Sequence, residues 1–354
     1  MSKFFSKKYS SLEPYTPGEQ PQDMNYIKLN TNESPFPPSK NAIKYAGEAA
    51  KKLNLYSDPE SKELTKKVAS YYGLKENQVL MTNGSDEILN FAFMAFCDDN
   101  HPAVFPDITY GFYPVFAEIN KVPYEEIPLN EDFTINVDDY IGLNKTIFIA
   151  NPNAPTSIAL SLSDIKRIVE GNSNSIVVVD EAYVDFGAES AVKLINDYDN
   201  LLVTQTFSKS RSLAGARLGM GLSNSKIIQD LNTIKYSTNP YNVNRMTSAS
   251  GIGALEDDDY MKENCKTITE NREYTVSELK KLGFEMPDSK ANFVFVKHPD
   301  FDGEELYKKL KSKGILVRHF TKKSICQYNR ITIGTKEQMC TLIKTLSEIM
   351  EEAK

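Results

Sequence analysis

Two residues with reactive side chains stand just beyond apolar runs of the chain. Asp180 follows the run at 176–179, and Lys209 lies a few residues past the run at 201–204. A carboxylate at the end of a buried strand needs a cation or hydrogen-bond donors, and an amine in low-dielectric surroundings can serve as a nucleophile. Taken singly, Asp180 could equally pair with a structural arginine, and Lys209 could be an ordinary surface lysine.

A third stretch has the form of an anion-binding turn. The run at 78–81 leads into the glycine-containing segment 82–87 and then into a helical pattern. Free backbone N–H groups and the helix dipole favour a phosphate there, although Ser85 could instead be a simple N-cap. Ser208 and Arg217 offer further donors to the same anion. A nucleophilic lysine, an acid suited to a pyridinium nitrogen and a phosphate site together describe pyridoxal 5′-phosphate chemistry.

The pattern around these residues predicts an α/β fold. Short apolar runs alternate with amphipathic stretches such as 87–96, 113–119 and 163–170, which is typical of a mostly parallel sheet covered on both faces. The runs lie at 78–81, 103–105, 146–150, 176–179, 201–204 and 218–222. Helices are also expected at 41–53 and 61–72, the second opened by a capping signal at Ser61. In such sheets ligands bind at the carboxyl ends of the strands, where Asp180 and Lys209 fall.

Three segments are expected along the chain. Residues 1–40 are rich in proline, asparagine, serine and tyrosine, which predicts an irregular arm lying over another surface. Residues 41–244 form the large α/β domain. Residues 245–354 form a small α+β domain, and its expected elements are a long helical stretch at 245–282, strands at 292–296, 315–318 and 330–333, and helices at 303–313 and 337–351.

Composition excludes several classes of function. The 354 residues carry 41 Lys+Arg against 48 Asp+Glu, a net charge of −7, which argues against nucleic acid as the main partner. No apolar run is long enough for a membrane span, and the N-terminus lacks the features of a signal peptide. The four cysteines are scattered and only three histidines are present, so free thiols in a reducing cytoplasm and no metal site are expected.

With these features in view, the chain resembles the fold-type I aminotransferases, and within them the histidinol-phosphate aminotransferase group. The matching motifs are NTNESP at 30–35, YSDP at 56–59, NGSDE at 83–87, TY at 109–110, NPNAPT at 151–156, DEAY at 180–183, SK at 208–209 with LAGAR at 213–217, and RITIGT at 330–335. Each motif is modest alone, but the ordered set spans nearly the whole chain. The resemblance implies a dimer whose subunits have a large domain with a mostly parallel, seven-stranded sheet and a smaller α+β domain.

The resemblance also implies roles for individual residues. Lys209 forms the Schiff base with the cofactor and moves the proton at the substrate α-carbon, Asp180 keeps the ring nitrogen protonated, and Tyr183 donates to the phenolic oxygen O3′. The other implied cofactor contacts are the backbone of Gly84, Ser85 and Asp86, the side chains of Ser208 and Arg217, Tyr110 stacked on the pyridine ring, and Tyr56 reaching the cofactor phosphate across the dimer. Tyr110 could instead be a packing aromatic residue.

For the substrate, the resemblance implies two arginines and a cover. Arg330 matches the family's carboxylate-binding arginine, whose planar fork suits a carboxylate or a phosphate. Arg318 matches a second substrate arginine, with an equal alternative as a surface cation beside His319. Tyr15 in the arm matches a residue that covers the substrate.

One departure from the family's pattern concerns O3′. The usual loop sequence is Asn-Asn-Pro-Thr-Gly, and its second asparagine contacts O3′; here that position is Ala154, and Ser157 replaces the glycine. Either Tyr183 serves O3′ alone, or Asn153 or Asn151 is turned toward it. The sequence leaves this choice open.

The function that follows is a pyridoxal-phosphate-dependent aminotransferase of histidine biosynthesis. It would exchange an amino group between an amino alcohol phosphate, histidinol phosphate, and a 2-oxo acid, 2-oxoglutarate. An aromatic amino-acid aminotransferase and a threonine-phosphate-type decarboxylase share the same cofactor residues and remain alternatives. A cofactor-binding relative without turnover is a further alternative, and a nicotinamide-dependent dehydrogenase is disfavoured by the lack of a G-x-G-x-x-G turn.

Overall fold

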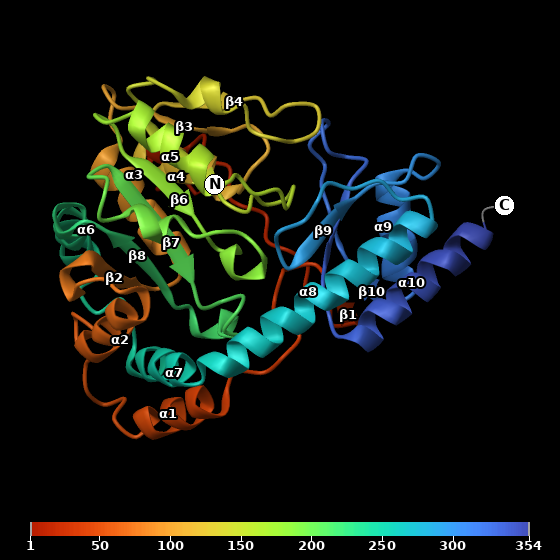
Figure 1. Ribbon diagram of the computed structural model, residues 1–354, viewed down its shortest axis with the longest axis horizontal. Helices are drawn as coiled ribbons and strands as arrows, with labels where there is room; N and C mark the ends of the chain where they lie inside the picture. The colour runs from red at the N-terminus through yellow and green to blue at the C-terminus, as the bar shows by residue number, and fades with distance from the viewer. Residues whose placement is uncertain (1, 353–354) are drawn as a thin grey trace.

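The computed structural model describes residues 2–352, and within them seven strands form the main sheet. Their order is β2-β8-β7-β6-β5-β3-β4, and β8 alone of these described strands runs antiparallel to its neighbours (Figure 1). The strands are β2 (Val79–Thr82), β3 (Ala103–Pro106), β4 (Tyr124–Ile127), β5 (Thr146–Ala150), β6 (Val177–Asp180), β7 (Leu201–Thr206) and β8 (Gly219–Ser223). The predicted α/β fold with a mostly parallel sheet is confirmed.

Helices bury both faces of this sheet, which explains why its strands read as continuous apolar runs. Val177 and Val179 of β6 belong to one core, and Val178 between them belongs to the core on the opposite face. Helices α2, α5 and α7 contribute to the first core, and α3, α4 and α6 to the second. The helices of this layer are α1 (Lys40–Ala50), α2 (Lys62–Tyr72), α3 (Ser85–Phe96), α4 (Phe112–Asn120), α5 (Leu162–Gly171), α6 (Ser225–Thr238) and α7 (Arg245–Glu256).

Two local expectations in the large layer were wrong. Strand β4 was missed because Tyr124, Glu125 and Glu126 are exposed at the edge of the sheet and give no apolar run. Helix α2 is not capped by Ser61, which has a left-handed backbone (φ 47°) and no capping hydrogen bond. The carboxylate of Asp58 accepts the first helical N–H instead, at 2.9 Å from the nitrogen of Lys62.

The second unit has its own core around a small antiparallel sheet of β11, β12 and β9. Its elements are α8 (Asp258–Lys281), β9 (Phe293–Val296), α9 (Gly303–Ser312), β10 (Ile315–Leu316), β11 (Arg318–His319), β12 (Asn329–Thr332) and α10 (Lys336–Glu351). The expected helical stretch at 245–282 is two helices that meet at Asp257, whose carboxylate binds the backbone and side chain of Asn41. Because α7 packs on α1 and shares the first core, we propose that the units divide near Asp257 rather than at 244.

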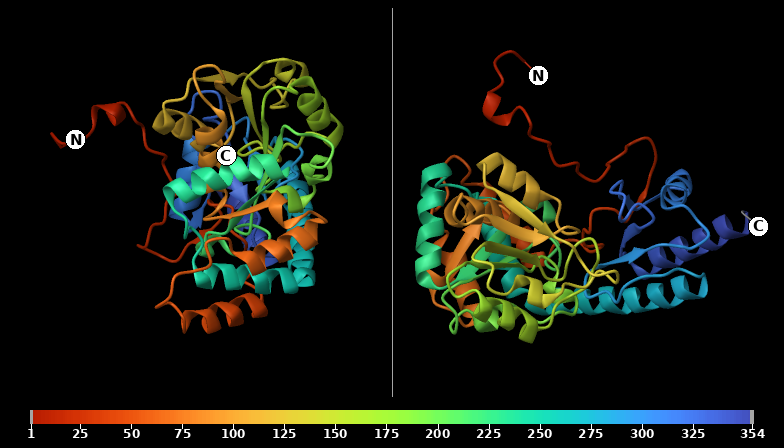
Figure 2. Two further views of the ribbon diagram at one scale, coloured as in Figure 1. Left: turned by 90° about the vertical axis from the view of Figure 1, so that its left-hand side faces the viewer. Right: turned by 90° about the horizontal axis from the view of Figure 1, so that it is seen from above.

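The N-terminal arm is anchored near its C-terminal end and again at residues 16–19, which contact Arg318 and Lys311. Strand β1 (Ile27–Lys28) pairs in parallel with β10, and Leu29 is buried in the small core. The start of the arm projects from the body of the molecule (Figure 2). None of the helices described is both long and apolar enough to cross a bilayer.

Candidate active site

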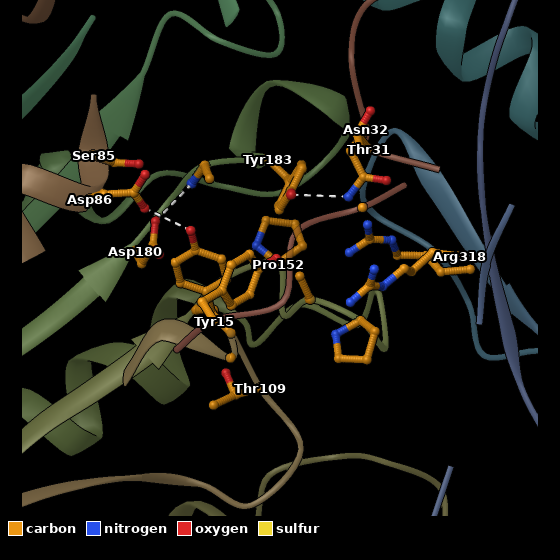
Figure 3. A pocket seen from close by; sticks show the side chains of 18 of the residues that line it. Tyr15, Thr31, Asn32, Ser85, Asp86, Thr109, Pro152, Asp180, Tyr183 and Arg318 are labelled. Atoms are coloured by element: carbon orange, nitrogen blue, oxygen red, sulfur yellow. Dashed lines mark hydrogen bonds between the residues drawn. The ribbon is translucent and has the colours of Figure 1, made fainter. Parts of the chain in front are cut away.

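A cavity lies at the carboxyl ends of β6 and β7, and residues of the small unit line its other side. Its volume is about 590 Å³. Asp180, Ser85 and Asp86 lie on one side of it and Arg318 on the opposite side (Figure 3). Three segments far apart in sequence therefore meet there: the strand ends of the large unit, the strand β11 of the small unit and the end of the arm.

Lys209 enters the cavity from the turn after β7. The buried side chain of Phe207 and the hydrogen bond from its backbone nitrogen to the Leu218 carbonyl hold this turn against β8. The Lys209 amine donates to the carbonyl of Thr31 at 3.3 Å and lies 5.7 Å from the centre of the Tyr183 ring. The amine thus has a single long hydrogen bond among the described residues and faces the open cavity.

Asp180 is a buried acid whose carboxylate faces the same cavity. It is only 5% exposed, and burial raises its pKa to about 6. Three donors offset part of this cost: the Tyr113 hydroxyl at 3.2 Å, the Thr204 hydroxyl at 3.3 Å and the backbone N–H of Ala182 at 3.3 Å. All three donors are neutral, so the carboxylate is arranged to receive a cation from the cavity side.

A phosphate-sized cradle lies at the N-terminus of α3. Gly84, at φ +78°, precedes the helix and provides no side-chain cap, so the first-turn N–H groups at Ser85 and Asp86 are available at the cavity wall. A Cβ on Gly84 would lie 2.5 Å from the guanidinium of Arg217. The Ser208 hydroxyl lines the same wall and accepts a hydrogen bond from Thr206 at 2.9 Å.

The carboxylate of Asp86 has a contact role that the sequence did not indicate. It accepts a hydrogen bond from the Tyr110 hydroxyl at 2.6 Å and an ion pair from Arg217 at 2.9 Å. Tyr110 and Arg217 are thus joined at the edge of the cradle. The Tyr110 ring also meets Tyr113 edge-on at 5.7 Å, so it is held as a wall of the cavity.

The arginines predicted for the substrate both line the cavity. Arg330 is half-buried, its Nη2 donates to the Asn30 carbonyl at 3.0 Å, and its buried Nε has no hydrogen-bond partner among the described residues. Arg318 donates to the carbonyls of Thr16 and Pro17 at 3.0 Å and so ties down the arm. An unpaired buried donor on a guanidinium is suited to an incoming anion.

Tyr15, predicted as a cover, lies at the cavity because Arg318 holds the residues beside it. Its ring stacks on Phe112 at 4.2 Å and lies 6.4 Å from the ring of Tyr110. Tyr56, in contrast, is 78% exposed, stacks on Tyr241 at 4.6 Å and does not line the cavity of its own chain.

The asparagines of the 151–156 loop do not face the cavity. Asn153 donates to the Ile108 carbonyl and to Thr156, both at 2.9 Å, and accepts from Thr109. Asn151 binds the backbone of Leu160 through both ends of its amide. Asn153 was expected to bind the cofactor; its amide instead supports the loop.

Sequence reasoning missed several groups that the structure places at the site. Tyr113 and Thr204 bind Asp180; Thr204 pairs with Asp180 in the β6–β7 register, and this neighbour position was the available signal. Asn32, near the C-terminal end of the arm, donates a hydrogen bond of 3.0 Å to the Tyr183 hydroxyl (Figure 3). Lys322 lines the cavity and donates to the Asp107 carbonyl, without a sequence signal.

The residues present fit pyridoxal phosphate. The cradle at Gly84 suits a phosphate, the buried acid with neutral donors suits a protonated ring nitrogen, and the free lysine amine suits an aldehyde. Within residues 2–352, no cluster of three or more His, Cys, Asp or Glu side chains is arranged to hold a metal ion.

Comparison with known proteins agrees with this class of site. A family model described as aminotransferase class I and II matches residues 24–346. The chain belongs to this family.

Individual relatives narrow the similarity to particular members of this family. Histidinol-phosphate aminotransferase of Brachyspira hyodysenteriae is 49% identical over 353 residues, which covers 99% of this chain and 100% of the relative. The solved structure of histidinol-phosphate aminotransferase from Sinorhizobium meliloti, in complex with pyridoxal-5′-phosphate, matches with a TM-score of 0.90 at 23% identity, over 100% of this chain and 99% of that one. L-threonine-O-3-phosphate decarboxylase from Porphyromonas gingivalis matches with a TM-score of 0.82 at 20% identity, over 92% and 99%. The fold alone therefore does not separate these two activities.

Proposed function

We propose that the chain is a pyridoxal-phosphate-dependent aminotransferase that moves an amino group between glutamate and imidazole-acetol phosphate, with histidinol phosphate and 2-oxoglutarate as the products. The observation that carries the proposal is the meeting of Lys209, buried Asp180 and half-buried Arg330 around one cavity. The 49% identity to a histidinol-phosphate aminotransferase supports this substrate, and thereby a place in histidine biosynthesis, over the alternatives.

The cofactor, when bound, supplies an aldehyde for amines and a ring that withdraws electrons from the substrate α-carbon. Lys209 is the residue whose amine faces that chemistry. Its single hydrogen bond to Thr31 would leave the neutral nitrogen able to take a proton from the α-carbon and to deliver it again before the amino group leaves the substrate. A single positioned base can carry out both proton transfers.

Asp180 and Tyr183 hold the charges that make this proton transfer possible. The raised pKa of Asp180 reflects a carboxylate with no cation beside it, and a protonated ring nitrogen would supply that cation. The Tyr183 hydroxyl faces the cavity and can donate to an anionic oxygen. Both groups act on charge without forming bonds to the substrate.

Arg330 and Arg318 are the groups we assign to substrate recognition. Histidinol phosphate carries a phosphate and 2-oxoglutarate carries carboxylates, and a planar guanidinium binds either with two parallel hydrogen bonds. The unpartnered Nε of Arg330 marks where such an anion is received. Tyr15 then covers the substrate from the arm.

A half-reaction screen tests the proposal. The cofactor-loaded protein is mixed separately with histidinol phosphate, phenylalanine and phosphothreonine, and both amine transfer and carbon dioxide release are scored. We expect amine transfer from histidinol phosphate at a rate at least about 100-fold above the other two, because only it matches the substrate of the relative. Lys209→Ala serves as the control and should lose turnover by about 10⁴-fold or more. Carbon dioxide release from phosphothreonine, or normal turnover by Lys209→Ala, would overturn the assignment.

We further propose that the protein acts as a homodimer in the cytoplasm. The exposed Tyr56, far from its own cavity, is suited to reach the cofactor phosphate of a second copy. Nearby Leu53 and Leu55 are each 56% exposed and give that region an apolar surface. The four cysteines are all free thiols, as expected in a reducing compartment.

A further inference from the structure

The hydrogen bond between Asn32 and Tyr183 has a direction that the surroundings fix. The backbone N–H of Asn32 donates to the Thr332 hydroxyl at 3.0 Å, and that hydroxyl lies 3.0 Å from the Asn32 Oδ1. Thr332 is 2% exposed and has no other side-chain acceptor among the described residues. Its proton is therefore satisfied only if Oδ1 faces it, because the opposite amide orientation leaves a buried hydroxyl proton unpaired.

Asn32 itself has little freedom to move. Its backbone is left-handed at φ 56°, a conformation that asparagine tolerates better than most residues. It is 1% exposed, and its carbonyl accepts a hydrogen bond from the Asn292 amide at 3.0 Å. Backbone and side chain are thus both held by strands of the small unit.

This arrangement decides what the Tyr183 hydroxyl can do. With Oδ1 directed at Thr332, the amide N–H of Asn32 points at Tyr183 and donates to its oxygen at 3.0 Å (Figure 3). The tyrosine oxygen is used as an acceptor, so its own proton remains available to an anionic oxygen in the cavity. Ala154 lines the same cavity and has no polar side chain, so an anionic oxygen there depends more strongly on the Tyr183 hydroxyl.

We propose that Asn32 is a positioning residue that keeps Tyr183 a hydrogen-bond donor toward the phenolic oxygen of the cofactor, with Thr332 setting the amide direction from the small unit. The proposal rests on the proposed function, since it requires the cofactor in this cavity. Asn32 is at the cavity wall, and the role assigned to it is exercised through Tyr183.

Asn32→Asp is the discriminating variant. Aspartate keeps the shape and tolerates the same backbone, but its carboxylate accepts where the amide donated, so the Tyr183 proton turns toward it. The readout is the visible absorbance of the cofactor-loaded protein titrated with pH. Without this donor the anionic phenolic oxygen is less stable, so the bound cofactor keeps its proton to a higher pH. We therefore expect the titration midpoint to rise by about one pH unit or more.

A double variant distinguishes the effect transmitted through Tyr183 from the direct electrostatic effect of the new carboxylate. In a Tyr183→Phe background, Asn32→Asp should move the midpoint by less than about 0.3 unit, because the group it acts through is gone. Thr332→Val, which frees the amide to turn and adds no charge, should raise the midpoint by a smaller amount and carries the test if Asn32→Asp does not fold. Asn329→Asp, at a buried asparagine of β12 bound to the Gly303 carbonyl, is the matched control and should leave the midpoint unchanged.

The outcomes distinguish the two levels of the argument. A wild-type midpoint in both Asn32→Asp and Thr332→Val, or an equal shift with and without the Tyr183 hydroxyl, overturns the positioning role while the proposed function stands. Absence of any cofactor absorbance in the wild-type protein overturns the proposed function itself.

Discussion

Two consecutive acids at the end of β6 illustrate how position alone separates their roles. Asp180 faces the cavity, and Glu181 lies on the opposite side, as successive residues of a strand must. Glu181 accepts from the Ser190 hydroxyl and the Ala191 N–H, both at 2.6 Å, and from Gln205 at 2.8 Å. Burial raises the pKa of Glu181 to about 7. Its protein partners are complete, so we assign it to the support of the strand end and Asp180 to the ligand.

The cost of keeping Asp180 charged leads to a prediction for the cofactor-free protein. Its native pKa of about 6 lies above the ordinary 3.8, so native stability falls as pH rises from about 4 to above 6. Asp180→Asn removes this penalty, and cofactor-free Asp180→Asn should be more stable than wild type by up to about 3 kcal/mol at pH 8.

Urea unfolding of the cofactor-free proteins at pH 4 and pH 8 measures this difference. The gain should shrink to about 0.5 kcal/mol at pH 4, where Asp180 is protonated in the native state and about 40% protonated in the unfolded state, and the variant should bind cofactor more weakly. Glu181 is present in both proteins and cancels. A variant no more stable than wild type at pH 8 would contradict the prediction.

Among single residues, those that follow apolar runs could be predicted from the sequence. Those that reach the site from the arm or from a helix were missed. Lys209 and Asp180 were found because each stands beyond a strand, where the fold class places ligands. Asn32 and Tyr113 were missed because one lies in an irregular arm and the other in the first turn of α4, where no spacing marks a contact. Asn153 was misjudged because the motif did not show that Ile108 and Thr156 already use its amide.

The approach of strand β8 to helix α3 shapes the phosphate cradle. A Cβ on Gly219 would lie 2.4 Å from the carbonyl carbon of Gly84 and 2.5 Å from the backbone nitrogen of Ser85. A side chain at 219 must therefore push the helix N-terminus itself, since backbone atoms cannot rotate aside. The glycine is needed for close contact between two elements, and its own backbone needs no positive φ.

Gly219→Ala should accordingly weaken cofactor binding by about 10-fold or more, the effect of about 1–3 kcal/mol of overpacking at the cradle. Gly221→Ala, two residues along the same strand, is the matched control because its Cβ would meet the Ile88 side chain 2.7 Å away in the core. It should lower stability and leave the affinity of the folded protein nearly unchanged. Fluorescence titration with pyridoxal phosphate measures the affinity of each variant. Equal losses of affinity in Gly219→Ala and Gly221→Ala would refute the role of the cradle.

The predicted elements were accurate where one periodicity dominates. Buried strands such as β5 and amphipathic helices such as α5 agree with the sequence pattern to within a residue or two. The edge strand β4 and the break at Asp257 could not be read, because they depend on tertiary contacts: pairing with β3 in one case and the hydrogen bonds to Asn41 in the other.

The arm is one of the connections between the two units at the active site. Asn30, Thr31 and Asn32 pass between them, where their backbone or side-chain atoms contact Arg330, Lys209 and Tyr183 in turn. Helix α8 joins the same units on the outside (Figure 1). An anion bound at Arg330 would therefore lie beside the segment that also contacts the lysine and the tyrosine.

A single chain leaves features that only an assembly would use. The start of the N-terminal arm projects from the body (Figure 2), and Tyr56 lies on the exposed connection between α1 and α2. If Tyr56 serves the cavity of a second copy, each site combines Lys209 of one chain with Tyr56 of the other. Mixing two inactive variants then tests the arrangement, because a mixed dimer carries both lesions in one site and none in the other.

Lys209→Ala and Tyr56→Ala, each expected to have low activity alone, should recover on mixing after a mild dissociation step. Random pairing makes about half of the dimers mixed, and one of their two sites is intact, so activity should reach about a quarter of the wild-type value. Tyr56 is largely exposed, which makes its replacement harmless to the fold of the chain. Tyr236→Ala, at another exposed tyrosine, is the control partner and should itself be active. Activity that stays at the mean of the two separate variants would show that each chain completes its own site.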